Sequence, residues 1–343
     1  MKALVKFATG PGGMGIQDMP EPVLIPGHAI IAVEACGICG TDLHIQAGEY
    51  PVSPPVVLGH EFSGTVVGVA PDVVSVHVGQ RVTSLVYFTV CGVCQFCQTG
   101  QWNLCKQRKS IGSGVNGAFA RYVLVPARNV RSLPENVDYI AGAVTEPLAC
   151  CAHGVLEKAT THPGDFAFVA GPGAIGLLTA QILISAGVTV ILAGTQADAD
   201  RLGLARTLGV QHTLQVETEP ITDIVQELTH GKGVDLVFEC SGAAAAARMG
   251  IEVAKRGGQF IQLGLYGKPV EISWDLAIMK EVDIRNSFAS TWISWDYALK
   301  LLESGKVQTS PLVSGVWPIH QWETAFERFS NKQGIKYILT PVP

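Results

Sequence analysis

Four of the chain's nine cysteines fall within one short segment, at Cys91, Cys94, Cys97 and Cys105. This spacing lets four thiolates converge on one tetrahedral ion, and Gly92 and Gly100 permit the turns that such a loop needs. Closed four-cysteine sites are typical of structural zinc, and a reducing cytosol disfavours disulfides. The segment therefore predicts a structural Zn²⁺ site.

Two alternatives for this segment fit its residues less well. An iron–sulfur cluster of the ferredoxin type needs a tighter last gap and a proline after the fourth cysteine, where this chain has Lys106. A zinc finger that binds nucleic acid needs more basic side chains than Lys106, Arg108 and Lys109 supply.

A second set of possible metal ligands is split between two segments. Residues 36–44 read CGICGTDLH, and residues 59–61 read GHE. One cysteine, one histidine and one carboxylate give three protein ligands and leave the fourth position of Zn²⁺ for water or substrate, which is the arrangement of a catalytic site. Glu146, directly before Pro147, is a further possible ligand or water partner. On spacing alone, an ordinary His–Glu pair at the surface or in the core is the stronger interpretation of residues 59–61.

A glycine-rich turn at residues 171–176 reads GPGAIG and matches G-x-G-x-x-G. The apolar run Phe166–Ala170 predicts a buried strand before it, and Ala174–Ala186 predicts a helix after it, whose N-terminus can receive a pyrophosphate. We therefore expect a dinucleotide cofactor to bind at Gly171, Gly173, Ala174, Ile175 and Gly176.

The acid that would mark an NAD-specific site is missing from the end of the next strand. Residues 193–196 read AGTQ, whereas Asp or Glu is expected there to bind the ribose 2′-hydroxyl. Arg201 or Arg206 can reach a 2′-phosphate, and Asp198 can fold back toward the ribose, so the choice between NAD and NADP stays open. Further cofactor contacts are expected at Thr195, Arg201, Cys240, Leu263 and Gly264.

The elements that must position these residues divide the 343-residue chain into two regions. The first 150 residues predict a β-rich region with strands at Ala29–Ala35, Gly64–Val69, Arg81–Phe88 and Ala120–Val125. From Asp165 strands alternate with helices, which predicts an α/β doubly wound parallel sheet. Its expected elements are the two above, strands Val188–Ala193, Asp235–Glu239 and Gln259–Leu263, and helix Asp200–Leu208. Helices are also expected at Trp295–Ser304 and near Thr324–Ser330, and a helix should open in the alanine run 243–247.

Composition narrows the class of protein. With 48% hydrophobic residues the chain can bury a large core, and its net charge of −5 makes nucleic acid an unlikely partner. We expect no secretory signal and a cytoplasmic protein. Residues 166–197 carry no charge, but their glycines and Pro172 favour a buried strand, turn, helix and strand over a membrane span.

Taken together, these motifs resemble the zinc-containing medium-chain dehydrogenase/reductase superfamily, in the family's order and over essentially the whole chain. The resemblance implies a GroES-like catalytic domain built from residues 1–150, with a zinc lobe at 88–108, and residues 288–343. It implies a Rossmann domain at 151–287. It also implies two Zn²⁺ ions per chain, NAD or NADP as cofactor, and a homo-oligomer, tetramer or dimer.

The resemblance also assigns roles to residues. Cys39, His60 and Glu61 would bind the catalytic zinc, Glu146 would contact the ion or its water, and Thr41 and His44 would relay a proton. A glutamate at position 146 resembles the sorbitol (polyol) dehydrogenase branch of the family. Alcohol dehydrogenases of the liver or yeast type carry a cysteine at this position. Candidate substrate residues are Tyr50 and Trp292.

The implied activity is hydride transfer between a secondary alcohol and NAD(P), giving a ketone. Polyol dehydrogenases of this branch carry an Arg-Tyr pair after a phenylalanine, where residues 288–292 read FASTW. Smaller alcohols, an inositol-like ring and threonine therefore remain open as substrates. A zinc-independent quinone or enone reductase and a non-catalytic dinucleotide-binding protein are the alternatives from other classes.

Overall fold

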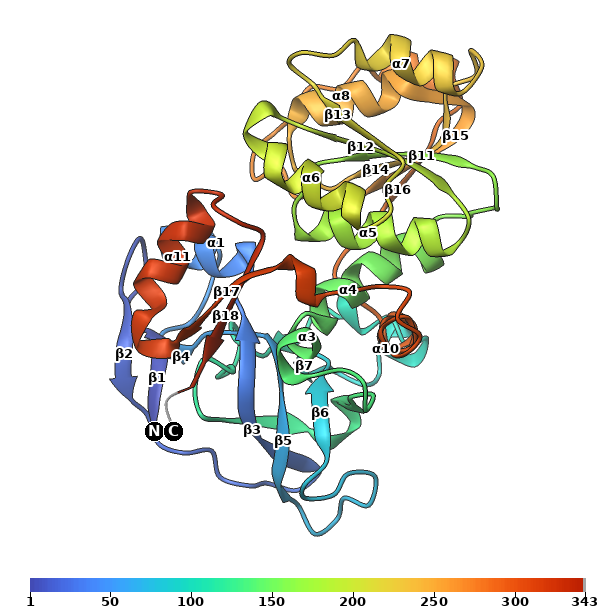
Figure 1. Ribbon diagram of the computed structural model, residues 1–343. Helices are drawn as coiled ribbons and strands as arrows, with labels where there is room; N and C mark the ends of the chain where they lie inside the picture. The colour runs from blue at the N-terminus through green and yellow to red at the C-terminus, as the bar shows by residue number, and fades with distance from the viewer. Residues whose placement is uncertain (342–343) are drawn as a thin grey trace. The chain divides into compact units, whose positions relative to one another are not determined.

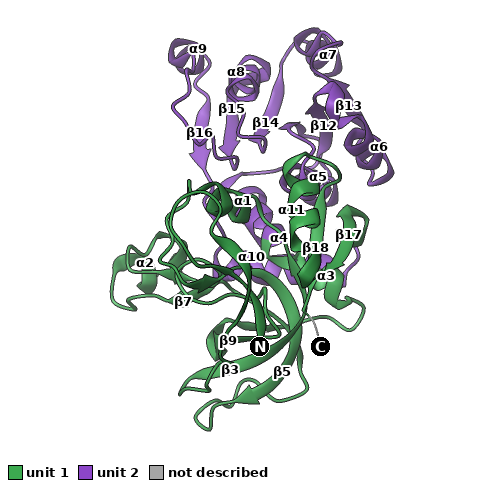
Figure 2. Ribbon diagram, turned by 90° about the vertical axis from the view of Figure 1, so that its left-hand side faces the viewer, with its two compact units in different colours: residues 1–146, 309–343 green, residues 147–308 purple. Residues whose placement is uncertain are grey.

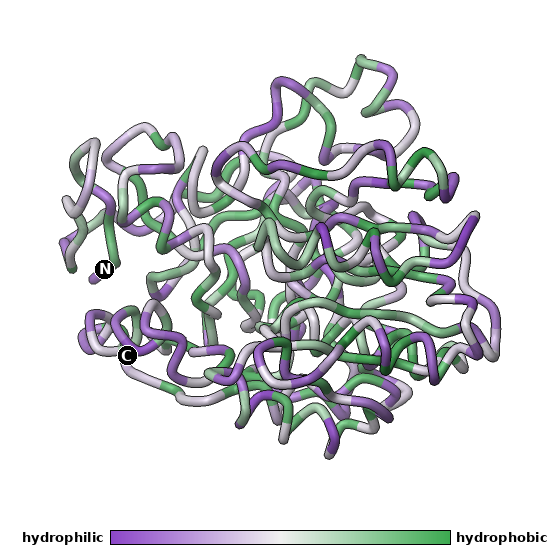
Figure 3. The backbone as a smooth tube through the Cα atoms, turned by 90° about the horizontal axis from the view of Figure 1, so that it is seen from above, coloured by the Kyte–Doolittle hydropathy of each residue, from purple (hydrophilic) through white to green (hydrophobic). Residues whose placement is uncertain are grey.

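The computed structural model describes residues 1–341, which form two compact units (Figures 1 and 2). Among the described residues, the first unit contains residues 1–146 and 309–341, and the second contains residues 147–308. The two halves of the first unit lie at the two ends of the chain, as the GroES-like arrangement implies. In Figure 3 many of the outer turns are hydrophilic, while much of the tube inside is hydrophobic. No helix in the described part of the chain has the length and apolarity needed to cross a membrane.

The boundary between the second unit and the C-terminal segment lies later than expected. Residues 288–308 belong to the second unit, whereas the sequence placed the boundary after residue 287. Two contacts hold this stretch there. Thr291 Oγ1 donates to Glu157 Oε1 at 2.6 Å, and the backbone N–H of Gln308 donates to Gln181 Oε1 at 2.8 Å.

The first unit is rich in β structure, as its alternating apolar runs predict. Its largest sheet has the order β10-β6-β5-β3-β18-β17, with β9 also pairing with β3. The strands are β1 (Lys2–Lys6), β2 (Met14–Asp18), β3 (His28–Gly37), β4 (Val56–Val57), β5 (Glu61–Val69), β6 (Arg81–Ser84), β7 (Tyr87–Thr89), β8 (Lys109–Ser110), β9 (Tyr122–Pro126), β10 (Val130–Ser132), β17 (Val313–Pro318) and β18 (Lys336–Thr340). Its helices and helical turns are α1 (Gly40–Ala47), α2 (Gln95–Gln98), η1 (Trp102–Leu104), η2 (Ala127–Asn129), α3 (Tyr139–Ala143), η5 (Ser310–Leu312), η6 (Ile319–Gln321) and α11 (Trp322–Ser330), while α4 (Thr145–Ala152) spans the boundary.

The expected single strand Arg81–Phe88 is wrong, because the chain breaks there into β6 and β7, which belong to different sheets. Asn129, which is fully buried, causes the break. Its side-chain Nδ2 donates to the carbonyl oxygens of Leu85 and Tyr87, and its backbone carbonyl oxygen accepts from the N–H of Leu85. These bonds replace the ladder that a continuous strand would need.

The second unit is a six-stranded, wholly parallel sheet of order β13-β12-β11-β14-β15-β16. This is the doubly wound order predicted for a dinucleotide-binding domain. The strands are β11 (Phe166–Ala170), β12 (Thr189–Gly194), β13 (His212–Gln215), β14 (Val234–Glu239), β15 (Ala254–Gln262) and β16 (Asp283–Asn286). The helices are η3 (His153–Lys158), α5 (Ala174–Ser185), η4 (Gln196–Asp198), α6 (Ala199–Thr207), α7 (Ile221–Leu228), α8 (Ala244–Val253), α9 (Trp274–Met279) and α10 (Trp292–Glu303).

Helices cover both faces of this sheet, with α5 and α6 on one face and α7 and α8 on the other (Figure 1). The central strands are buried on both sides, which explains why residues 166–197 carry no charge. The buried strand, turn, helix and strand expected there are confirmed as β11, α5 and β12.

Candidate active site

The structure brings Cys39, His60 and Glu61 together, so that one possible ligand atom from each lies within 4.8 Å of the other two. Cys39 follows β3 and is the N-cap of α1, while Glu61 opens β5. The antiparallel pairing of β3 with β5 sets Gly37 opposite Glu61 and thereby joins the two segments that the sequence left apart. A side chain at position 37 would collide with the Glu61 carboxylate, because its Cβ would lie 2.4 Å from Oε2.

Lys336 fixes the Glu61 carboxylate, and the sequence analysis missed it. Its Nζ donates to both carboxylate oxygens, at 2.8 and 2.7 Å, and to the carbonyl oxygen of Ile38 at 3.0 Å. The two side chains are only 4% and 1% exposed, so this is a fully buried ion pair. The available signal was a lysine that opens a strand whose next three residues are apolar or aromatic, Lys336–Thr340.

The charges around this cluster favour a bound cation. Burial alone would lower the pKa of His60, but the charge and hydrogen bond of Cys39 together with the carboxylates of Asp42 and Glu146 outweigh it and hold the pKa well above its usual value. Burial also raises the pKa of Asp42 to about 6, although the backbone N–H of Cys39 donates to its carboxylate at 2.9 Å. A thiolate, an imidazole and a carboxylate at this spacing fit the donor set of Zn²⁺ with one position left open.

The other predicted catalytic residues lie near the cluster or on the same helix. Thr41 Oγ1 is 3.7 Å from Cys39 Sγ. His44 is exposed in the last turn of α1, and its Nδ1 pairs with Glu49 Oε2 at 2.6 Å, a partner that the sequence analysis did not identify. Glu146 is buried in the first turn of α4 and contributes to the raised pKa of His60, but it lies outside the three-residue cluster.

The four cysteines of residues 91–105 also form one cluster within 4.8 Å. Backbone N–H groups of Cys94 and Val93 donate to Cys91 and lower the pKa of its thiol to about 6, which favours the thiolate. The N–H of Cys91 donates in turn to Cys105 Sγ at 3.5 Å. Four sulfur donors with backbone support fit a closed structural zinc site.

This zinc lobe has little other stabilisation, since its helical elements are the short α2 and η1. We therefore expect Cys94→Ser to lower the zinc content from two ions to one per chain and to open residues 91–105 to proteolysis. Metal analysis and limited proteolysis check this. Cys150→Ser is the control, because Cys150 belongs to neither cluster. A variant that keeps two zinc ions would contradict the assignment.

In the second unit, the three glycines of the turn between β11 and α5 have separate roles. Gly171 has φ +100°, where a side chain would be strained. A Cβ at Gly176 would lie 1.8 Å from the carbonyl oxygen of Gly171, whereas a Cβ at Gly173 would meet nothing within 4 Å. Gly173 thus leaves room over the first turn of α5, where the N–H groups of Ala174 and Ile175 have no earlier helical carbonyl to bind.

The end of β12 lies beside this turn, because the N–H of Gly171 donates to the carbonyl of Ala193. Asp198 turns back onto Thr195, accepting from its N–H at 3.0 Å and its hydroxyl at 2.7 Å, and pairs with Arg201 at 3.0 Å. Glu217 Oε2 accepts from the N–H of Gln196 at 2.8 Å. The carboxylates of Asp198, after β12, and Glu217, after β13, are therefore both already bonded to the protein.

The remaining predicted cofactor residues follow the ends of two neighbouring strands, Cys240 after β14 and Leu263 and Gly264 after β15. The fully buried carboxylate of Glu239 organises both loops. It accepts from the N–H of Ser241 at 2.8 Å and from Gln262 Nε2 at 2.7 Å. Glu239 was not predicted from the sequence, although an acid at the end of an apolar parallel strand is a signal for such a role.

The two predicted substrate residues lie in different units. Tyr50 is in the loop after α1, and its backbone N–H donates to the carbonyl of His44. Trp292 is the first residue of α10 in the second unit, directly after the N-cap Thr291.

A β-rich unit with an open metal cluster and a closed four-cysteine lobe, joined to a doubly wound unit with a glycine turn, defines a class: the zinc-type, dinucleotide-dependent dehydrogenases. The family model of the alcohol dehydrogenase GroES-like domain matches residues 25–135, and that of zinc-binding dehydrogenases matches residues 174–304.

Relatives agree with this class. The chain is 40% identical to a sorbitol dehydrogenase of Halalkalibacterium halodurans over the full length of both. It is 38% identical to a D-arabitol-phosphate dehydrogenase of Enterococcus avium, over 100% of this chain and 98% of the relative. A crystal structure described as a zinc-binding dehydrogenase, from Sinorhizobium meliloti with NADP bound, superposes with a TM-score of 0.92 at 33% identity and 99% coverage of both chains.

The chain therefore belongs to the zinc-containing medium-chain dehydrogenase/reductase superfamily. It is an enzyme of the NAD(P)-dependent alcohol and polyol dehydrogenase type. The zinc-independent reductase and the non-catalytic binding protein are not favoured, because these relatives are dehydrogenases and both metal clusters are in place.

Proposed function

We propose that the chain oxidises a secondary hydroxyl of a polyol to a ketone and transfers the hydride to NAD⁺ or NADP⁺. The observation that carries this proposal is the cluster of Cys39, His60 and Glu61, which offers three ligands and an open position. The polyol class is supported by the sorbitol and D-arabitol-phosphate dehydrogenases among the relatives.

In this proposal Cys39, His60 and Glu61 hold the catalytic zinc. Glu61 keeps its bond to Lys336 while it binds the ion, because a carboxylate has about four lone-pair positions and can serve both partners. Glu146 lies close enough to His60 to help raise its pKa, and in this proposal it orients the water or substrate hydroxyl at the open zinc position.

Bound zinc supplies Lewis-acid chemistry, which lowers the pKa of a substrate hydroxyl. The chain's own residues then move the proton. Thr41 and His44 are three residues apart on α1 and so share one face of the helix. Thr41 Oγ1 would take the substrate proton while its own hydroxyl proton passes on toward solvent, and the exposed His44 would take up a proton at Nε2 and release it to solvent, since its Nδ1 is bonded to Glu49.

The direct test is the reduction of NAD⁺ and NADP⁺, followed by absorbance, with sugar alcohols, inositols, simple alcohols and threonine. We expect one polyol class to support turnover. Turnover with threonine alone or with simple alcohols alone would overturn the assignment to polyols.

The bonding at the end of β12 supports use of both cofactors. Asp198 is hydrogen-bonded to Thr195 and paired with Arg201, so it repels a 2′-phosphate less than an unpaired carboxylate would. The guanidinium of Arg201 provides a cation for that phosphate, while a ribose 2′-hydroxyl can bond to the neighbouring carboxylates.

Arg201→Ala is therefore expected to raise KM for NADP⁺ by about tenfold, with a change below about twofold for NAD⁺. The reason is that, of the two cofactors, only NADP⁺ carries the phosphate with which the guanidinium would form a further charge-assisted bond. Steady-state kinetics with each cofactor measures the two values. Arg248→Ala, which removes an exposed arginine of α8 in the same unit, is the matched control. Equal changes for NAD⁺ and NADP⁺ would contradict this assignment.

A further inference from the structure

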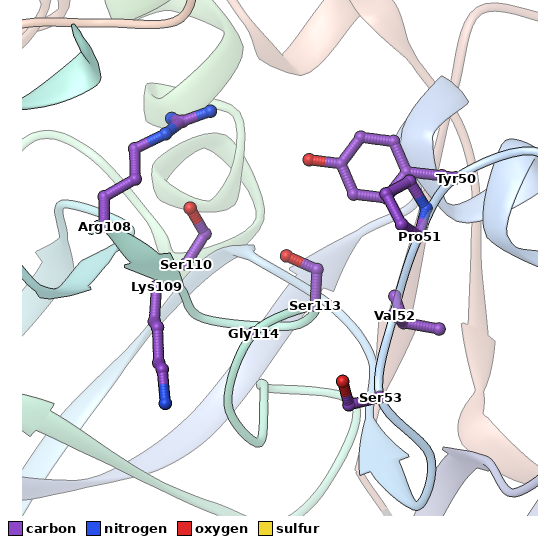
Figure 4. A pocket seen from close by; sticks show the side chains of 9 residues that line it. All are labelled: Tyr50, Pro51, Val52, Ser53, Arg108, Lys109, Ser110, Ser113 and Gly114. Carbon is purple, nitrogen blue, oxygen red and sulfur yellow. The ribbon is translucent and has the colours of Figure 1, made fainter. Parts of the chain in front are cut away.

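A hollow of about 260 Å³ opens on the first unit beside the loop that follows α1. One wall is the loop around Tyr50, and the other is β8 with the turn after it (Figure 4). The polar side chains lining it are those of Tyr50, Ser53, Arg108, Lys109, Ser110 and Ser113. Neither metal cluster nor the glycine turn includes these residues.

The side chains of this hollow converge from both walls. In Figure 4 the Arg108 guanidinium and the Tyr50 hydroxyl reach toward each other across the opening, and the hydroxyls of Ser110 and Ser113 face the space between them. The Lys109 side chain runs the other way. One guanidinium and three hydroxyls thus surround one volume.

The backbone holds this arrangement in place. The carbonyl of Ser110 accepts from the N–H of Gly114 at 2.8 Å and from that of Val115 at 3.1 Å, which fixes the turn carrying Ser113. The Arg108 guanidinium lies over the Tyr87 ring, 5.9 Å from its centroid. Preorganised donors lose little freedom when a ligand binds.

The positive charge of the residues lining the hollow favours an anionic ligand. Two of its lining residues are cationic and none is acidic, although the chain as a whole has a net charge of −5. The nearest acid in sequence, Glu49, is already paired with His44. A guanidinium with several hydroxyl donors matches a phosphate monoester, which carries nearly two negative charges at neutral pH and three acceptor oxygens.

The hollow is linked to the metal cluster by a single element. Helix α1 begins after Cys39 and ends at the loop that contributes Tyr50. A ligand anchored here by its phosphate is therefore held in a fixed relation to Cys39.

We propose that this hollow binds the phosphate of a phosphorylated polyol, with Arg108 as the principal anchor and Ser110, Ser113 and Tyr50 as hydroxyl donors. The proposal rests on the polyol dehydrogenase function above and narrows its substrate class to polyol monophosphates.

The test compares pentitols and hexitols with their terminal monophosphates as substrates of the zinc-loaded enzyme. We expect kcat/KM to be at least about tenfold higher for a monophosphate than for its parent polyol. Arg108→Ala should raise KM for the monophosphate by about ten- to a hundredfold, with kcat and the KM of the parent polyol nearly unchanged. Arg108→Lys should recover only part of the loss, because lysine lacks the planar fork.

Lys109→Ala is the matched control, since it removes the adjacent cation that turns away from the hollow. It should change KM for the monophosphate by less than about threefold. A larger effect of Lys109→Ala than of Arg108→Ala would overturn the assignment of the anchor.

Calorimetric binding of a polyol monophosphate and of inorganic phosphate separates the remaining outcomes. Binding of the monophosphate that depends on Arg108 supports the phosphate site. If the enzyme binds the monophosphate in this way but turns over no polyol or polyol phosphate, the polyol dehydrogenase function proposed above is overturned instead. Turnover of parent polyols without any gain from the phosphate overturns the phosphate site alone. Arg108-dependent binding of inorganic phosphate but not of monophosphates would mean an adventitious ion only, and would also overturn it.

Discussion

Replacing Cys39 by serine is expected to reduce turnover by about a thousandfold or more while leaving NAD(P) binding intact. Cys39 is one of three residues whose ligand atoms lie within 4.8 Å of one another, so the substitution leaves two of three protein ligands. Loss of Lewis-acid assistance costs several kcal/mol of transition-state stabilisation, and each 1.36 kcal/mol is a factor of ten in rate. Steady-state rates, zinc content and cofactor binding by fluorescence titration measure the three quantities.

Cys36→Ala is the matched control for this substitution. Cys36 is buried three residues earlier, at the end of β3, and is outside both metal clusters. It should keep two zinc ions per chain and most of its activity. Wild-type turnover in Cys39→Ser, with zinc still bound, would show that the cluster is not the catalytic metal site.

Lys336→Met is expected to destabilise the zinc-free protein, in which no ion pairs with Glu61, by about 3–5 kcal/mol, the second large effect. Methionine keeps most of the aliphatic length but removes the cation that bonds both oxygens of Glu61. The carboxylate would then be buried without its partner, which costs far more than the pair itself contributes. Urea unfolding of both proteins, compared at equal denaturant slope, measures the change.

Lys2→Met removes the lysine of an exposed pair with Asp18 and is the control for charge loss. It should change the free energy of unfolding by less than about 1 kcal/mol. If Lys336→Met were as mild as Lys2→Met, then water or another group must satisfy Glu61, and the positioning role of Lys336 would be wrong.

The features that depend on short stretches of sequence could be predicted. All four cysteines of the zinc lobe fall in residues 91–105, and the whole glycine turn falls in residues 171–176. In such segments the spacing limits how the backbone can arrange the side chains, so residue type and spacing carry most of the information. The doubly wound order of the second unit followed for the same reason from alternating strands and helices.

Contacts between distant segments could not be predicted in this way. Glu61 and Lys336 are 275 residues apart, and only the pairing of β18 with β3 and of β3 with β5 brings them together. In the sequence, a lysine beside apolar residues fits an exposed strand edge as well as it fits a buried ion pair. Likewise, nothing local places Arg108 opposite Tyr50.

Element boundaries failed where side chains compete with the backbone for hydrogen bonds. Helix α10 begins at Trp292 rather than at Trp295, because Thr291 caps it by accepting from the N–H of Ser294. The buried Asn129 breaks the expected strand Arg81–Phe88 in a similar way. Such side-chain bonds have no periodic signature in the sequence.

The most direct test of the central claim is the rate of NAD(P)H formation with the best polyol substrate, measured before and after removal of zinc by a chelator and after zinc is added back. We predict that activity falls to background when both ions are removed and returns when zinc is restored. Full activity in protein shown by metal analysis to hold no zinc would contradict the account.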